Sequence, residues 1–194
     1  MAAKKKMFLL NKEHEYAKDY IVSVGGETVY VGPLYAFNGD PEENAAVFRR
    51  CALLSGVITA LMLVCGFLRV SAMSLSSVTP LAYGLGLIAD FVLLVSCIRL
   101  ARAKQPMQRR AFDTSFRRLR WLPAVSAVLG AAAFVSAVVF CISHREAGFA
   151  LPDAVFPAAQ AAAAVLAFLI FRTGTGILYH VIEQEEPDVS PENT

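Results

Sequence analysis

Asp90 is the residue whose position in this sequence most directly suggests chemistry. It is the single charged residue in the apolar run 71–98. In a helix that crosses a membrane, its carboxyl group would lie near the bilayer midplane. A lone acidic side chain costs free energy there unless it is protonated, solvated or paired. A functional carboxyl at this depth carries protons or cations along a transport path. A structural one accepts a hydrogen bond, or pairs with a cation on a partner subunit.

Several polar side chains are spaced so that they could meet Asp90. A separation of seven residues places Tyr83 on the same helical face, two turns away. Ser126, Ser136 and Gln160 lie in other apolar runs and are the expected hydrogen-bonding partners. Because no Lys or Arg lies within two turns of Asp90 on its own helix, desolvation favours the protonated acid. We therefore take Asp90, Tyr83 and Gln160 as the candidate functional residues within the membrane.

A second group of chemically capable residues is basic. The segment 99–120 contains eight Lys or Arg residues against one acid, Asp113, which is spaced to pair with Arg109 or Arg117. Basic clusters beside membrane-spanning helices bind anionic headgroups, so we expect membrane lipid and no nucleic acid as the partner of this loop. The arginines expected to face lipid are Arg109, Arg110, Arg117, Arg118 and Arg120.

Sequence patterns of known catalytic and metal sites do not occur. The three histidines are scattered over different segments, and the chain has no HExxH, GxSxG, GxxxxGK or Rossmann glycine pattern. The four cysteines lie in or at the ends of apolar runs without a CxxC pair, which is typical of buried thiols. We expect no catalytic residues, no metal and no cofactor, and therefore no enzyme.

Four long apolar runs must position these residues. The chain is 56% hydrophobic, with a mean hydropathy of +0.52. About 20 apolar residues in a helix match a hydrocarbon layer of roughly 30 Å. A soluble bundle would need charged residues on the outer face of each helix, and these runs lack them. The sequence therefore predicts an all-α integral membrane protein, a four-transmembrane-helix bundle with spans near residues 50–70, 79–100, 121–143 and 154–173.

Positive charge is concentrated before the first span and in the middle loop. The other two loops, 71–79 and 144–153, carry little charge. Because short cytoplasmic loops collect Lys and Arg, we expect both termini to be cytoplasmic, in a cell membrane. The apolar stretch 7–10 is too short for the core of a signal peptide, so the first span is expected to act as its own insertion signal.

The N-terminal region contains a hairpin signal. β-forming residues within 20–31 flank Gly25-Gly26, and two glycines suit the primed turn of a two-residue hairpin. Such a turn places Val22 opposite Val29. Because an isolated hairpin is marginal in water, we expect it to contact the membrane-proximal surface, a second copy or another protein.

Two helix starts are predicted outside the spans. Asp40 is a good N-cap before Pro41, and Glu43 is spaced to complete a capping box. Pro106 is expected to begin a helix that continues into the third span and lies in the headgroup layer. The apolar face of that helix carries Phe112, Phe116 and Leu119.

The chain therefore divides into three parts. Residues 1–40 form a tail with the hairpin, 41–182 the helical membrane domain, and 183–194 an acidic tail expected to be disordered. Small residues at four-residue spacing recur in the later spans, as at Ser126 and Gly130. They allow close helix packing, either inside the bundle or at an external dimer face.

These features lead to two expectations for function. The first is a non-catalytic accessory or assembly subunit of a larger membrane complex, because the small hairpin and acidic tail resemble docking elements. Its partner would be another membrane or cytoplasmic subunit, or a second copy of the chain. The alternative is a small transporter or channel subunit that uses Asp90. A water-lined cavity around Asp90 would favour transport, and a dry, hydrogen-bonded core would favour structure.

Overall fold

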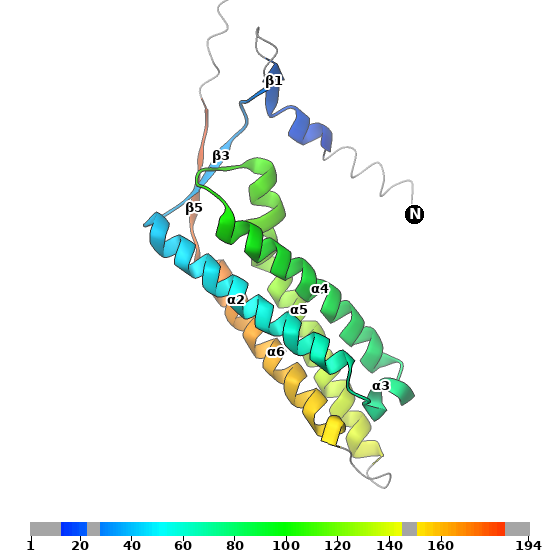
Figure 1. Cartoon of the computed structure of the whole chain (residues 1–194). Coiled ribbons are helices and arrows are strands. Elements are labelled where there is room, and N and C mark those ends of the chain that lie inside the picture. The colour runs from blue at the N-terminus through cyan, green and yellow to red at the C-terminus, as the bar shows by residue number, and fades with distance from the viewer. Residues whose placement is uncertain (1–12, 23–27, 145–150, 185–194) are drawn as a thin grey trace, which may run out of the picture.

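The computed structural model describes residues 13–22, 28–144 and 151–184. Within them, the long helices are α2 (Pro41–Gly66), α4 (Val78–Arg102), α5 (Arg109–Ser143) and α6 (Leu151–Gly176), and a short helix, α3 (Ser71–Leu75), precedes α4. The strands are β1 (Tyr20–Val22), β2 (Thr28–Tyr30), β3 (Leu34–Phe37), β4 (Met107–Gln108) and β5 (Tyr179–Ile182). Figure 1 shows the long helices side by side and the strands gathered at one end of them.

Each of the four long helices is long and apolar enough to cross a membrane. Even α4, with 25 residues, exceeds a hydrocarbon layer of roughly 30 Å at about 1.5 Å per residue. Three of the predicted spans lie wholly within these helices. The first predicted span, 50–70, begins within α2 and extends four residues past its end at Gly66.

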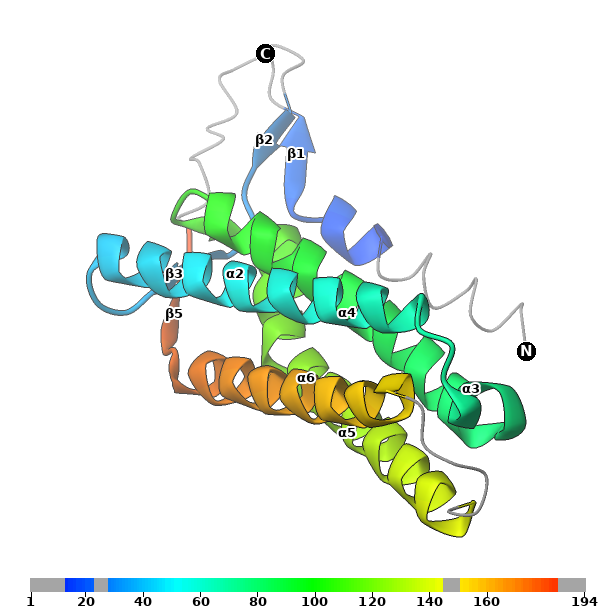
Figure 2. The ribbon, with the colours of Figure 1, turned by 60° about the horizontal axis from the view of Figure 1, so that its bottom comes forward.

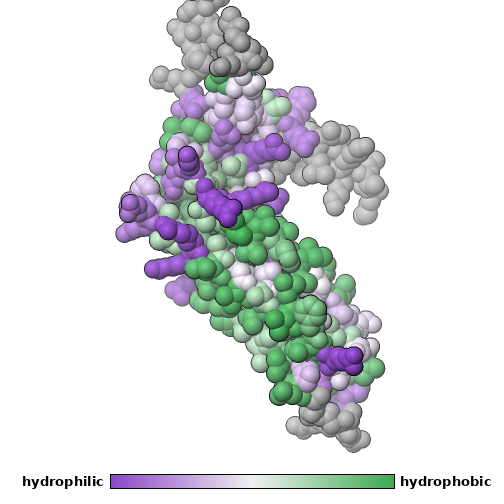
Figure 3. Space-filling model, in the orientation of Figure 1, coloured by the Kyte–Doolittle hydropathy of each residue, from purple (hydrophilic) through white to green (hydrophobic). Residues whose placement is uncertain are grey.

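The outer faces of the helices are apolar, and polar side chains are turned inward. On the face that Figure 3 shows, hydrophobic residues cover the middle of the helices, most hydrophilic residues gather toward the strand end, and a smaller hydrophilic group lies at the opposite end. Leu53 is 71% exposed and Phe67 88%. The buried polar side chains of the long helices include Ser55, Thr59, Thr79, Asp90, Ser96, Ser126 and Gln160. This distribution is the one expected of helices surrounded by hydrocarbon.

Helix α5 packs between α4 and α6, and α2 contacts α4 and α6 in turn. Small residues lie at these contacts. A Cβ added at Gly130 of α5 would lie 3.4 Å from the Cβ of Ala164 on α6. A Cβ added at Gly86 of α4 would lie 3.4 Å from the Cε of Met62 on α2. A Cβ at either position would already be in van der Waals contact with the neighbouring helix, so these contacts have room for small residues and not for large ones.

The start of α2 agrees only in part with its prediction. Asp40 is the N-cap and Pro41 the first helical residue, as predicted, but the Asp40 side chain makes no capping hydrogen bond. The predicted capping box is therefore wrong. The Asn44 side-chain amide instead donates to the Asn38 carbonyl at 3.0 Å, which ties the first turn to the chain before the cap.

The predicted helix start at Pro106 is also wrong. Met107 and Gln108 form β4, and α5 begins at Arg109. The local proline signal is overridden because β4 pairs with β3, a strand distant in sequence. The apolar face expected in the headgroup layer is buried: Phe112, Phe116 and Leu119 lie in the main core. The ring of Tyr35 stacks on that of Phe112 with 4.2 Å between centroids.

A three-stranded antiparallel sheet has the order β4-β3-β5. It joins the segment before α2, the connection between α4 and α5, and the segment after α6. These three segments therefore lie at the same end of the helices (Figure 1). Strand β5 falls at the end of the segment 41–182, which was expected to be a helical membrane domain, and the sheet is not among the expectations from the sequence.

The β1–β2 hairpin forms, but in another register. Ile21 lies opposite Val29, and Val22 lies opposite Thr28. The prediction that Val22 faces Val29 is therefore wrong by one residue, which exchanges the faces of one strand. Five residues, 23–27, separate the paired strands, and they lie outside the described residues together with the turn predicted at Gly25-Gly26. Figure 2 shows the hairpin standing away from the helices.

Candidate functional site

Asp90 lies in the interior between α4 and α5. It is 2% exposed, and the hydroxyl of Ser126, which is also buried, donates a hydrogen bond to its Oδ1 atom. Ser126 was one of the partners expected from the sequence, and this contact confirms it. A buried acid with a hydrogen-bond donor on the neighbouring helix has the geometry of a packing contact.

Tyr83 and Gln160 meet at Met62 of α2. The Tyr83 hydroxyl donates to the Met62 backbone carbonyl at 2.6 Å, and the Gln160 Nε2 atom lies 3.3 Å from the Met62 sulfur. A Cβ added at Gly66 would lie 2.6 Å from the Tyr83 hydroxyl, so glycine leaves the room that this hydroxyl needs. Among the described residues, no hydrogen bond links Asp90 to Tyr83 or Gln160, so the three residues do not form one cluster.

The Gln160 side chain has one unsatisfied atom. Gln160 is fully buried, and its Oε1 atom has no hydrogen-bond partner within the described part of the chain. A buried amide oxygen without a donor is unusual in a folded protein. It marks the polar position in the helix interior at which a further donor is most favoured.

Two further polar contacts lie at the end of the helices opposite the sheet. The hydroxyls of Thr79 and Ser136 are 2.8 Å apart, so Ser136 pairs with Thr79 and not with Asp90. Asp153, in the first turn of α6, accepts the Ser71 backbone N–H at 2.7 Å and the Ser71 hydroxyl at 3.2 Å. In the sequence Asp153 is one of the few charges of the loop 144–153, and its burial depends on the contact with Ser71 of α3.

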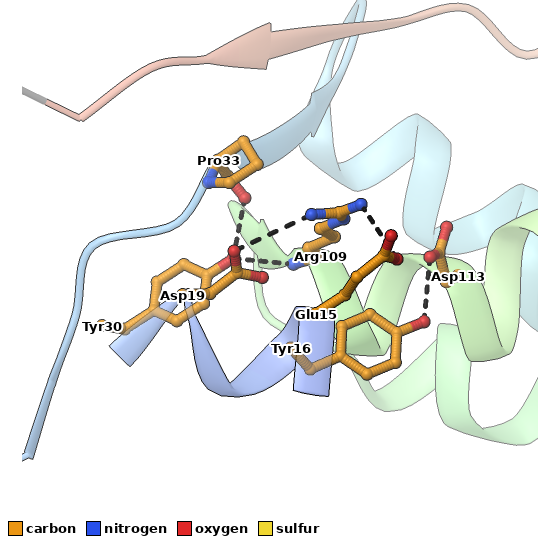
Figure 4. A network of polar contacts seen from close by, with 7 residues as sticks. All are labelled: Glu15, Tyr16, Asp19, Tyr30, Pro33, Arg109 and Asp113. Atoms are coloured by element: carbon orange, nitrogen blue, oxygen red, sulfur yellow. Dashed lines mark hydrogen bonds and ion pairs between the residues drawn. The ribbon is translucent and has the colours of Figure 1, made fainter. Parts of the chain in front are cut away.

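Arg109, the first residue of α5, is held between two acids at the strand end of the helices (Figure 4). One guanidinium nitrogen lies 3.8 Å from Glu15, and another lies 3.8 Å from Asp19. The Arg109 backbone N–H donates to the Tyr30 hydroxyl at 3.0 Å, and that hydroxyl donates to the Pro33 carbonyl at 2.9 Å. The N-terminal segment is therefore fastened to the start of α5.

A second set of contacts strengthens this attachment. The Tyr16 hydroxyl donates to the Asp113 carboxylate at 2.9 Å, and Asp113 lies 3.8 Å from Arg117. The Tyr20 hydroxyl donates to the Gln108 side-chain oxygen at 3.1 Å. The predicted Asp113–Arg117 pair is thus confirmed, whereas Arg109 takes its partners from the N-terminal segment.

The tyrosine hydroxyls of this network hold their protons tightly. Burial, with a further contribution from the hydrogen bond to Asp113, raises the pKa of Tyr16 to about 12. Burial also raises the pKa of Tyr30, although the hydrogen bond from the Arg109 backbone opposes that shift. At neutral pH both hydroxyls are therefore donors, to Asp113 and to the Pro33 carbonyl.

The sequence does not predict this network, because lysines outnumber acids within residues 1–19. Glu15 and Asp19 are four residues apart, a spacing that places two carboxylates on one side of a helical turn. That spacing was the available signal, since residues 13–17 are helical. The other arginines of the predicted lipid-facing set are Arg110, Arg117 and Arg120, which are exposed, and Arg118, which is half-buried.

The described residues were also compared with the side-chain groups that bind metal ions. No group of three His, Cys, Asp or Glu side chains in the described ranges could hold a metal ion. His180 is engaged elsewhere, with its Nδ1 atom 2.7 Å from the Asn38 side-chain oxygen. Comparisons of the chain with family models, with curated proteins and with solved structures found no match.

Proposed function

We propose that this chain is a four-span membrane protein that serves as a non-catalytic accessory or assembly subunit of a larger membrane complex. The observation that carries the proposal is the exposed hairpin fastened to the start of α5. Ile21 and Val29 are opposite one another across β1 and β2, and they are 37% and 42% exposed. A two-stranded sheet with an exposed apolar pair is the kind of surface that a protein partner stabilises.

The membrane placement rests on the distribution of side chains over the four long helices. Their outer faces are apolar, and their polar side chains are buried between them. In this proposal the helices form a bundle in a cell membrane, and the sheet and hairpin lie on the cytoplasmic side. The basic middle loop on that side agrees with the rule that cytoplasmic loops collect Lys and Arg.

Within this proposal, Asp90 is a structural residue. Its burial and its hydrogen bond from Ser126 support a role in packing α4 on α5. In a packing role, the Asp90 carboxyl does not need to gain or lose a proton during function. The partner is then recruited at the strand end and not through the membrane-embedded carboxyl.

Anionic lipid is proposed to contact the arginines nearest the third span. Residues 117–120 lie within about 6 Å along the helix of residue 121, where the predicted span begins, whereas Arg109 lies about 18 Å from it. Arg109 is also paired with Glu15 and Asp19. We therefore assign the lipid contact chiefly to Arg117, Arg118 and Arg120. In this proposal the basic loop does not bind nucleic acid.

Affinity capture in a mild detergent tests the proposal. The tagged chain, expressed in its native host, is expected to retain a stoichiometric protein partner. Ile21→Asp should lose that partner, because a charge replaces an apolar contact. The matched control is Thr28→Asp, which adds the same charge to an exposed polar position of the same hairpin. Absence of any partner, or equal retention by Ile21→Asp, would contradict the proposal.

The alternative function is a small transporter or channel subunit that uses Asp90. The observation that favours it is the burial of Asp90 beside a neutral donor, the Ser126 hydroxyl, because a buried acid that forms no ion pair in the described part of the chain can take up and release a proton. Flux across liposomes that disappears in Asp90→Asn, with the fold intact, would support this alternative over the accessory role.

A further inference from the structure

Among the strands that the structure describes, β5 is an open edge of the three-stranded sheet. The sheet order is β4-β3-β5, so β5 pairs with β3 on one side. All four residues of β5 are exposed, and Val181 is 48% exposed. An exposed edge strand presents unpaired backbone groups to which another extended chain can add.

The register identifies those backbone groups. Ala36 lies opposite His180, and the Asn38 N–H donates to the carbonyl of Leu178. In an antiparallel ladder, hydrogen-bonded and non-hydrogen-bonded pairs alternate. Residues 178, 180 and 182 therefore direct their backbone groups toward β3. The backbone N–H and C=O groups of Tyr179 and Val181 point to the open edge.

The edge is held in place before any partner arrives. The Tyr179 ring lies 4.7 Å from the ring of Phe112 and 5.7 Å from that of Phe116, measured between centroids. His180 is tied to Asn38 on the β3 side. Because an ordered edge loses little conformational freedom on binding, it is a favourable template for strand addition.

The charge at the end of β5 indicates what kind of strand would fit. Glu183 follows the strand, is exposed, and has no ion pair among the described residues. The sequence continues with further acids, Glu185, Glu186 and Asp188. A strand added antiparallel to β5 begins beside Glu183, so basic residues at its N-terminal end are complementary to this carboxylate.

We propose that β5 binds an extended segment of a partner protein by strand addition, in antiparallel orientation, with lysines or arginines at the N-terminal end of that segment and β-forming residues after them. The open-edge groups of Tyr179 and Val181 supply the backbone hydrogen bonds. This inference goes beyond the proposed function, because it concerns a surface separate from the hairpin and holds whether or not the hairpin recruits a subunit.

The test uses the full chain in nanodiscs of zwitterionic lipid, which avoids attraction of the probe to anionic lipid. The probe is a fluorescent peptide of sequence Lys-Lys-Lys-Thr-Val-Thr-Val with blocked ends, titrated by anisotropy. Saturable binding is expected. Val181→Pro removes an N–H from the open edge, where proline is tolerated, and should raise the Kd about tenfold. The matched control Val181→Thr keeps the N–H and should bind as the parent does.

Three further measurements test the backbone hydrogen bonds, the charge of Glu183 and the independence from the hairpin. A peptide with N-methylated backbone amides cannot form the ladder, so it should bind the unmodified chain about tenfold more weakly. Glu183→Lys should weaken binding of the Lys-rich peptide and strengthen binding of a peptide that begins with glutamates. Ile21→Asp should leave binding unchanged, which separates this inference from the hairpin proposal. Equal binding by Val181→Pro, or by the N-methylated peptide, would overturn the inference.

Discussion

The hydroxyl of Tyr16 donates a hydrogen bond of 2.9 Å to the carboxylate of Asp113, which lies 97 positions later in the chain. The contact fixes the N-terminal helical turn to α5. It requires a protonated phenol, because a phenolate beside a carboxylate would repel it and donate no hydrogen bond. The attachment of the N-terminal segment is therefore linked to the protonation of one side chain.

High pH is expected to release this contact. The pKa of Tyr16 is raised from 10.0 to about 12 by burial and by the Asp113 hydrogen bond. Because the folded state holds the proton more tightly, the stabilisation is complete below pH 10, the unfolded value, and is lost as the pH rises through about 12. A phenolate absorbance titration of the parent minus that of Tyr16→Phe should show one tyrosine with a midpoint near 12. A midpoint near 10 would contradict the structure.

Gly32→Ala should loosen the same attachment. A Cβ at this position would lie 2.6 Å from the Cβ of Asp19 and 2.8 Å from the Tyr30 hydroxyl. Asp19 or Tyr30 must then move. Arg109 would lose its ion pair with Asp19 or its hydrogen bond to the Tyr30 hydroxyl. Hydrogen exchange should accelerate in residues 13–22. Gly176→Ala is the control, since a Cβ there meets nothing within 4 Å. Unchanged exchange in Gly32→Ala would show that the network tolerates the extra atom.

Replacements of Asp90 should separate its structural role from a transport role. Asp90→Asn keeps an oxygen that accepts from Ser126, so the free energy of unfolding in micelles should change little. Asp90→Leu leaves the Ser126 hydroxyl unpaired and should cost about 1–3 kcal/mol. In a double-mutant cycle, Ser126→Ala should remove most of that penalty. The structural assignment fails if Asn destabilises as much as Leu.

Gly130→Leu should force α5 and α6 apart. The Cβ alone would lie 3.4 Å from the Cβ of Ala164 and 3.5 Å from the Gln160 carbonyl oxygen, which leaves no room for a larger side chain. Overpacking of this kind costs about 1–3 kcal/mol. The control is Val128→Leu, at a position that is 68% exposed on the same helix. Equal unfolding free energies of the two variants would contradict the described helix contact.

Cysteine labelling should establish the orientation. In a background without the native cysteines, a cysteine at Ser76 should react with an impermeant reagent added outside intact cells. A cysteine at Gln108 should react only after permeabilisation, because the middle loop is expected to be cytoplasmic. The two positions lie at opposite ends of α4, beyond its first and last residues. The reverse pattern of labelling would overturn the orientation.

The helices were predictable from the sequence because their signal is local. A long apolar stretch can be recognised from its own residues, whatever it packs against in the fold. Each predicted span falls largely within a long apolar helix. The contact between Asp90 and Ser126 was also within reach. A polar residue buried in lipid must find another polar residue, and few were available at a similar depth.

The sheet was beyond prediction because its strands are short and distant in sequence. Leu34–Phe37 carries no alternation of polar and apolar residues, and its partners lie after α4 and after α6. The predicted register of the hairpin was wrong for a related reason. Gly25-Gly26 suggested a two-residue turn, but five residues separate the paired strands, so a local turn rule gave the wrong pairing.

The arrangement of the sheet links the order of synthesis to the integrity of the molecule. Strand β3 is made before any of the long helices, yet its two neighbours are β4, made halfway along the chain, and β5, made after the last helix. A chain that stops before Tyr179 leaves one side of β3 uncovered beside the aromatic rings of Phe112 and Phe116. In such a product β3 pairs with β4 alone, whereas in the finished chain β5 covers its second edge.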